Sequence, residues 1–199
     1  MTSLLLLTLL SQDPFRVAAR NYTLEFENDW VKIVRVRYKP HDKTVLHDHP
    51  SAPAVYVYVT DGGRLKFAHD EYGPMIRKPV LAGALRYNRG RAEKHTVEEL
   101  DGISSEYFRV ELKMKPVDLP ERDVRRAPED RTPFSSKMIR ILRVTCQPLS
   151  TCPASEHPED PAVLIYGRQF QWQAPGLSLD INGSGAAMEQ VRIELVSRP

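Results

Sequence analysis

Short runs in which apolar and polar residues alternate recur along most of the chain. Val31–Tyr38 alternates with a partial period of two, which is typical of a strand with one face in a core. Val55–Thr60 is rich in β-branched and aromatic residues, and the turn signal Asp61-Gly62-Gly63 follows it. Further strands are predicted at Arg64–Ala68, Met75–Lys78, Gly83–Tyr87 and Tyr107–Lys113. Because no stretch has the period of an amphipathic helix, the pattern predicts an all-β sandwich or barrel.

The chain contains an internal repeat. Residues 31–58 (VKIVRVRYKPHDKTVLHDHPSAPAVYVY) align without a gap with residues 139–166 (IRILRVTCQPLSTCPASEHPEDPAVLIY), and ten of the 28 positions are identical. FRVEL at 108–112 pairs with VRIEL at 191–195. The offset falls from 108 to 83 between the two matches, so the second copy is 25 residues shorter. A repeat of this kind indicates two copies of one module, of which the second should lack strands from its middle.

The sequence divides into four parts. Residues 1–19 form an apolar N-terminal segment, and residues 20–114 form the complete first module. Residues 115–134 carry prolines among dense mixed charge, which is typical of a linker. Residues 135–199 form the reduced second module. Because lost strands expose sheet edges and apolar faces, we expect this module to dock onto the first, or onto a second subunit in a homodimer, and not to fold alone.

A histidine pair stands on one of the predicted strands of the first module. His47-Asp48-His49 is an HxH motif, and strand geometry points both histidines to the same face with Asp48 on the other. Two imidazoles on one face can share a metal ion. His95, which follows the turn-forming stretch 88–91, is the candidate third ligand from another strand.

These motifs resemble those of the cupin superfamily. His47, His49 and Gly62 match its first motif, and Gly83, Gly90 and His95 match its second. The phrase PHDKTVLHDHPSAPAVYVYVTDG is similar to small bacterial cupin proteins that often carry export signals. The resemblance implies tandem double-stranded β-helix (jelly-roll) barrels, a bicupin whose second barrel is reduced. It implies a divalent transition metal on His47, His49 and His95, and a small-molecule ligand in the first barrel.

The sequence departs from the family pattern at the fourth ligand. Where the first motif has a glutamate, the chain reads Pro53, Ala54, Val55. A bound metal would have three nitrogen ligands and open positions, which suits Zn²⁺, Fe²⁺, Ni²⁺ or Cu²⁺. Tyr87 and Glu93 are candidates for groups beside such a site. Two functions stay open, namely a metal-dependent enzyme acting on a small molecule, and a non-catalytic binding or structural module without a tightly bound metal.

The remaining histidines are expected to bind no metal. His41 and His69 fall in predicted turns or loops and should be solvated. In the second copy His157 matches His49, but Ser155 stands where His47 is. Ser178 stands where His95 is, counted back from VRIEL. We therefore expect a metal-free second module in which His157 packs or forms hydrogen bonds.

Composition and the N-terminus add four further points. The net charge is +2 with interspersed signs, which gives no electrostatic reason to bind nucleic acid. No apolar run is long enough to span a membrane. Leu4–Leu10 resembles the hydrophobic region of an atypical export signal, which favours a periplasmic or secreted protein over a cytoplasmic one. Cys146 and Cys152 are either one bridge closing a short loop or two free thiols.

Overall fold

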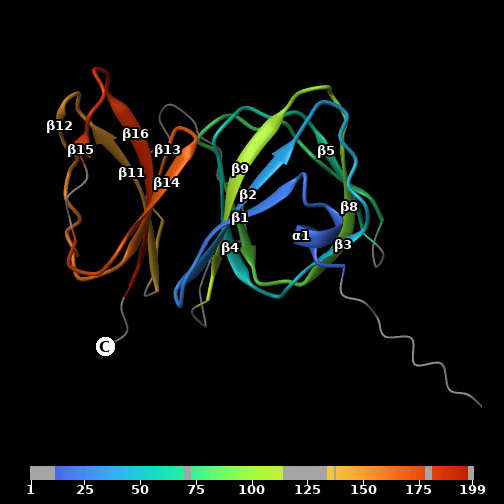
Figure 1. The fold of residues 1–199 in the computed structure, drawn as a ribbon, viewed down its shortest axis with the longest axis horizontal. Coiled ribbons are helices and arrows are strands. Elements are labelled where there is room, and N and C mark those ends of the chain that lie inside the picture. The colour runs from blue at the N-terminus through green and yellow to red at the C-terminus, as the bar shows by residue number, and fades with distance from the viewer. Residues whose placement is uncertain (1–11, 70–72, 114–133, 137, 178–180, 197–199) are drawn as a thin grey trace, which may run out of the picture.

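The computed structural model describes residues 12–69, 73–113, 134–136, 138–177 and 181–196. Two β modules lie side by side in it, residues 12–113 and residues 134–196 (Figure 1). The segment 115–134, predicted as a linker, lies outside the described residues except for Phe134. Among the described residues, no helix is long and apolar enough to cross a membrane.

The described residues of the first module form one short helix and nine strands. A five-stranded sheet has the order β1-β2-β9-β4-β7, and a four-stranded sheet has the order β3-β8-β5-β6. The strands predicted from sequence all form, with ends moved by one or two residues. The elements are α1 (Pro14–Val17), β1 (Tyr22–Glu27), β2 (Val31–Tyr38), β3 (His47–His49), β4 (Pro53–Tyr58), β5 (Leu65–His69), β6 (Met75–Arg77), β7 (Leu85–Arg89), β8 (Glu93–Glu99) and β9 (Ser105–Leu112).

The second module repeats the larger sheet but not the smaller one. Its five-stranded sheet has the order β10-β11-β16-β13-β14, which matches the larger sheet of the first module strand for strand. A two-stranded pair, β12-β15, stands in place of the four-stranded sheet, as the 25 missing residues predicted. The elements are β10 (Phe134–Ser135), β11 (Ile139–Cys146), β12 (Ser150–Thr151), β13 (Ala162–Tyr166), β14 (Gln169–Gln173), β15 (Ile181–Asn182) and β16 (Met188–Leu195).

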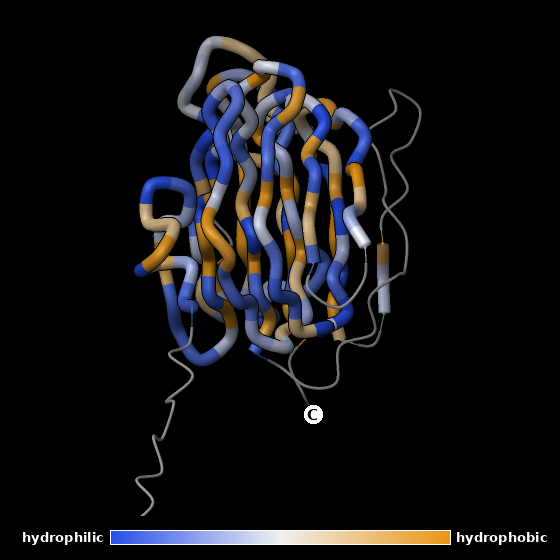
Figure 2. Tube along the Cα trace, turned by 90° about the vertical axis from the view of Figure 1, so that its right-hand side faces the viewer, coloured by the Kyte–Doolittle hydropathy of each residue, from blue (hydrophilic) through white to orange (hydrophobic). Residues whose placement is uncertain are grey.

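The large sheets of the two modules pack face to face. Apolar and polar residues are interspersed along the sheets (Figure 2), and the sides of the two large sheets that face each other are apolar. The facing side chains form one buried cluster, to which the first module contributes Val31, Ile33, Phe108, Val110 and Leu112, and the second Ile139, Ile141, Val191, Ile193 and Leu195. The second module therefore packs onto the first module of the same chain, which is one of the two arrangements predicted from the sequence.

Strand β9 is buried along its whole length because it separates two cores. Phe108, Val110 and Leu112 point into the cluster between the modules. The alternate residue Tyr107 points into the barrel of the first module, where it packs with Val34, Tyr38 and Tyr58. A strand with this burial pattern fixes the position of the barrel interior relative to the second module.

Residues 12–19, which the sequence placed in the N-terminal segment, pack against the first barrel. The Asp13 carboxylate caps α1 by accepting a hydrogen bond from the backbone N–H of Phe15. The backbone N–H of Asp48 in β3 donates to the carbonyl of Gln12 at 2.9 Å. The predicted export segment Leu4–Leu10 lies outside the described residues.

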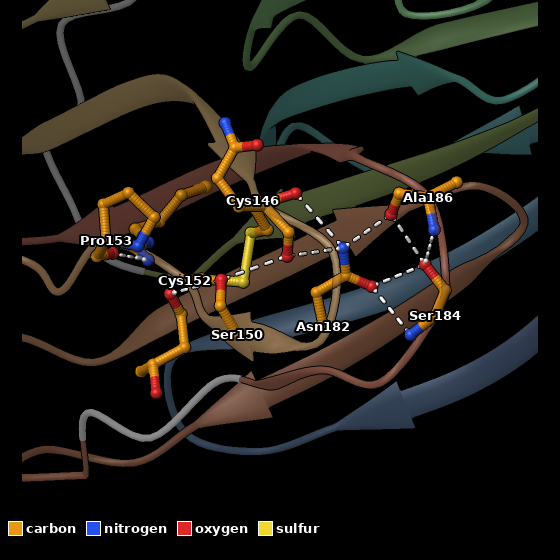
Figure 3. The surroundings of a disulfide bond; sticks show 10 residues. Cys146, Ser150, Cys152, Pro153, Asn182, Ser184 and Ala186 are labelled. Carbon is orange, nitrogen blue, oxygen red and sulfur yellow. Dashed lines mark hydrogen bonds between the residues drawn. A yellow bond between two sulfur atoms is a disulfide. The ribbon is translucent and has the colours of Figure 1, made fainter.

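Cys146 and Cys152 are joined in a disulfide, which answers the question left open by the sequence (Figure 3). Both half-cystines are buried, at the end of β11 and just after β12. The side-chain amide of Asn182 in β15 donates to the carbonyls of Cys146, Gln147 and Ala186 beside them. Closing a loop of this length stabilises a fold by about 2 kcal/mol in the chain-entropy model. The bridge and this amide hold together the part of the module that has lost its second sheet.

Candidate metal centre

Three histidines meet on two paired strands of the smaller sheet. Strands β3 and β8 are antiparallel neighbours in which His47 lies opposite His95, and His49 lies opposite Glu93. His47 and His49 are buried on one face of β3, while Asp48 between them is only partly buried. The structure thus brings together the three residues that the sequence selected as metal ligands.

The histidine cluster, defined as His47, His49 and His95, is compact and buried. One ring nitrogen from each residue lies within 4.8 Å of the other two. The ring centroids are 4.9 Å apart for His47 and His49, 4.9 Å for His47 and His95, and 5.2 Å for His49 and His95. None of the three side chains is more than 6% exposed. These spacings allow three nitrogens to surround a single ion.

The electrostatic surroundings keep these imidazoles neutral. Burial lowers the pKa of all three, and for His95 it does so to about 3, with His47 and His69 adding to the effect. The cationic side chain of Arg109 lowers the pKa of His49 further. A neutral imidazole carries the lone pair that a metal ion requires, so the cluster is in the protonation state of a ligand set.

The hydrogen bonds of His47 fix its tautomer. Its Nδ1 lies 2.8 Å from the carbonyl oxygen of Val45, and because a carbonyl can only accept, Nδ1 carries the hydrogen. The lone pair is therefore on Nε2, which lies 2.9 Å from the hydroxyl of Tyr22. Metal-binding histidines commonly donate their other N–H to a backbone carbonyl in this way.

One nitrogen of His95 lacks a protein partner. Its Nδ1 is buried and has no hydrogen-bond partner among the described residues. The nearest carboxylate oxygen, Oε2 of Glu93, is 4.0 Å away, which is beyond hydrogen-bonding distance. Burial raises the pKa of Glu93. A buried nitrogen without a partner is a rare arrangement that a metal ion would satisfy, so the residues present fit a divalent transition metal.

His69 corrects one prediction, because it is neither in a loop nor solvated. Strand β5 extends to His69, which pairs with His95 on β8, and their ring centroids are 5.1 Å apart. Leu65 and Phe67 precede His69 at alternate positions, and this period of two was the signal that could have placed it on the strand. His41 is exposed at a turn, as predicted.

A cavity of about 450 Å³ opens next to the histidine cluster. His49 and His95 line it, as do Tyr87 and Glu93, which the sequence had suggested as neighbours of the site. Sequence reasoning missed the other polar and aromatic groups of its wall, because they come from three strands, β4, β6 and β9, that are distant from one another in the sequence. They include Tyr56, Tyr58, Tyr107, Arg77 and Arg109.

The corresponding region of the second module differs. His157 is 46% exposed on its side chain, and its Nδ1 lies 3.2 Å from Glu159, so it forms a polar contact but is not packed in a core as His49 is. The hydroxyl of Ser155, at the position of His47, donates to Glu194 at 2.6 Å. Ser178 lies outside the described residues. His157, Glu159 and Asp160 are close enough to hold an ion, but Asp160 is already paired with Arg140.

Comparisons with known proteins identify the fold. No protein family model and no curated protein sequence matches the chain. Among solved structures, a mutant of oxalate decarboxylase from Bacillus subtilis is 12% identical, covers 90% of this chain and 76% of its own, and superposes with a TM-score of 0.56. AerE from Microcystis aeruginosa is 13% identical over 89% of this chain and 98% of its own, with a TM-score of 0.52. A cupin domain from Bordetella pertussis is 24% identical over 47% of this chain and 92% of its own, with a TM-score of 0.41.

Proposed function

We propose that this chain, which has the all-β tandem jelly-roll fold of the cupin superfamily, binds one divalent transition metal on His47, His49 and His95 of its first barrel. The observation that carries the proposal is the histidine cluster itself, three buried and neutral imidazoles within 4.8 Å of one another. With only three protein nitrogens, a bound metal would have coordination positions left for another ligand, and His49 and His95 line the cavity. A small molecule in that cavity would be the ligand or substrate.

The chemistry of such a site would depend on the coordination positions of the metal that the protein does not fill. A metal held by three imidazoles acts as a Lewis acid towards an oxygen of the bound molecule, or lowers the pKa of bound water. The protein supplies a partly aromatic cavity next to the histidines, and the hydroxyl of Tyr22 lies 2.9 Å from Nε2 of His47. We therefore propose a metal-dependent enzyme that acts on a small molecule in the first barrel.

The donor set bears on the choice of metal. Imidazole ligands suit Zn²⁺, Fe²⁺, Ni²⁺ and Cu²⁺, whereas carboxylate ligands suit Mn²⁺. A structure of the Bacillus subtilis oxalate decarboxylase was determined in work on its Mn(II) centres. In this chain the carboxylate of Glu93 is not part of the group of ligand atoms that all lie within 4.8 Å of one another, so the metals that prefer imidazole are favoured over manganese.

A non-catalytic binding module is the second candidate. The hydroxyl of Tyr22 already meets the lone pair of His47 at 2.9 Å, so this histidine is satisfied without a metal. The two candidates differ in metal content. If the first is right, full-length protein purified without a chelating tag should contain a stoichiometric amount of transition metal by elemental analysis. Protein that stays metal-free after incubation with each of the four metals would support the second.

We also propose that the protein works outside the cytoplasm. The disulfide between Cys146 and Cys152 is buried, and such bridges persist in oxidising compartments. Because Gln12 and Asp13 already pack on the barrel, removal of an export signal should leave a chain that begins at or before Gln12. Intact mass of the protein isolated from a bacterium that exports it should show this shortened, oxidised chain. A full-length chain with free thiols would contradict the proposal.

A further inference from the structure

Two buried arginines in the first barrel have N–H groups without a hydrogen-bond acceptor among the described residues. Arg77 on β6 and Arg109 on β9 are only 5% and 3% exposed, and both line the cavity beside the histidine cluster. One terminal nitrogen of Arg77 donates to the hydroxyl of Tyr58, but its Nε and Nη2 find no acceptor among the described residues. The same two nitrogens of Arg109 have none. Glu111 lies 3.0 Å from Nε of Arg109 as an ion pair, without hydrogen-bond geometry.

Such an arrangement is unfavourable unless something outside the chain completes it. A buried charged donor that has left water without finding an acceptor loses the free energy of its hydration. Natural proteins therefore rarely bury a guanidinium in this state, and here two of them share one cavity. The free N–H groups indicate that a hydrogen-bond acceptor enters the cavity from solution.

The internal repeat supplies a comparison within the same chain. Arg192 on β16 matches Arg109, and its Nη2 donates to the carbonyl of Pro153 at 2.7 Å. Pro153 matches Val45, whose carbonyl in the first module accepts from Nδ1 of His47 at 2.8 Å instead. The second module has a serine where His47 stands. A terminal nitrogen of its arginine therefore has a backbone acceptor, whereas in the first module His47 bonds the corresponding carbonyl, and Nη2 of Arg109 has no acceptor among the described residues.

The residues that line the cavity indicate the chemistry of a molecule that would fit. A guanidinium is a planar fork that matches a carboxylate or a phosphate in two parallel hydrogen bonds. The carboxylates of Glu93 and Glu111 lie close to Arg109 and disfavour a second negative charge there, so a monoanionic carboxylate fits better than a phosphate dianion. The rings of Tyr56, Tyr58 and Tyr107 line the same cavity and supply apolar surface for an apolar body.

We propose that the cavity of the first barrel binds a small organic carboxylate, whose carboxylate group accepts hydrogen bonds from Arg109, with Arg77 as a second cationic contact, and whose apolar body packs on the tyrosine rings. The volume of about 450 Å³ suits such a molecule. The inference deepens the proposed function, on which it rests for the role of the cavity as the ligand site. It places the anionic group of the ligand on the side of the cavity next to His49.

Benzoate and its neutral analogue benzamide are the probes that test this. Their affinities for the full-length protein are measured by titration calorimetry, once with metal removed by a chelator and once with metal added. Benzoate should bind in both states and benzamide more weakly. Arg109→Lys keeps a positive charge beside Glu111 but loses the fork, so benzoate affinity should fall by about tenfold or more while benzamide affinity stays the same.

Two further variants separate this effect from a change in the fold. Arg77→Gln should also weaken benzoate binding. Arg64→Gln removes an exposed guanidinium of the same barrel, paired with Asp101, and should leave it unchanged. The proposal is wrong if benzoate and benzamide bind with equal affinity, or if Arg109→Lys and Arg77→Gln leave the affinity for benzoate unchanged. If inorganic phosphate binds more tightly than benzoate and its binding depends on the arginines, the choice of a carboxylate is wrong. Arginine-dependent benzoate binding by a protein that takes up no metal supports this inference and rejects the metal site.

Discussion

The His47→Ala, His49→Ala and His95→Ala proteins should each lose most of the transition metal that the unchanged protein carries. Each variant removes one of only three protein nitrogens, and the described residues offer no fourth ligand within the same 4.8 Å group. Loss of an outer partner of a metal ligand lowers affinity by roughly 10–100-fold, so loss of a ligand should exceed that. Metal content is measured by elemental analysis after purification without a chelating tag.

Two histidines of the same chain serve as controls for this experiment. His157→Ala changes the residue that matches His49 in the second module and should leave metal content unchanged. His69→Ala changes a ring 5.1 Å from His95 that is outside the group of three, and it should also retain metal. A thermal transition recorded for each variant shows that it is folded. Equal metal content in all five variants would reject the site in the first barrel.

Residues 134–196, expressed alone, should show no cooperative unfolding transition, whereas residues 12–113 should retain one. The second module has kept one five-stranded sheet and only a two-stranded pair opposite it. The apolar face of its large sheet, with Ile139, Ile141, Ile193 and Leu195, is buried only against the first module. Each apolar side chain exposed on separation removes about 1.5–3 kcal/mol of burial free energy, and a domain is stable by only about 5–15 kcal/mol.

The intact chain offers a check on the same interface. Ile193→Ala, at a fully buried position between the modules, should lower the free energy of unfolding by about 2–5 kcal/mol. Leu149→Ala, at a leucine that is 74% exposed, should change it by less than about 0.5 kcal/mol. Denaturant titration measures both. A cooperative transition of monomeric 134–196 by itself would mean that the second module closes its own core, and the docking argument would be wrong.

The fold could be predicted from the sequence because the patterns that indicate its strands are either local or repeated. The alternation in Val31–Tyr38 predicted β2, and the matched FRVEL and VRIEL segments predicted two closing strands, which are β9 and β16. The predicted all-β fold of two jelly-roll modules with a reduced second copy is confirmed by the matching strand orders, and solved structures share the fold. Periodicity and repetition are read directly from one sequence, so they needed no knowledge of contacts.

The cavity wall could not be predicted in the same way. Arg109 stands in a strand whose eight residues are all buried, so its side-chain pattern does not reveal which face meets the barrel. Arg77 ends a three-residue strand whose first two residues are exposed. Their common cavity results from pairings between strands distant in sequence, which a single sequence does not encode as spacing. His69 is different, because its alternation with Phe67 was readable and was overlooked.

The double burial of β9 has a consequence for how the protein is made. Residue Val31 on β2 pairs with Leu112 on β9, so the first barrel closes only after the ribosome has delivered β9, the last strand of the first module. Long-range pairings of this kind form slowly, and domains fold as units while synthesis proceeds from the N-terminus. Once β9 is in place, Phe108 and Val110 present an apolar surface before the second module has emerged. The second module, whose large sheet packs on the first module, is thus translated after the surface on which it packs.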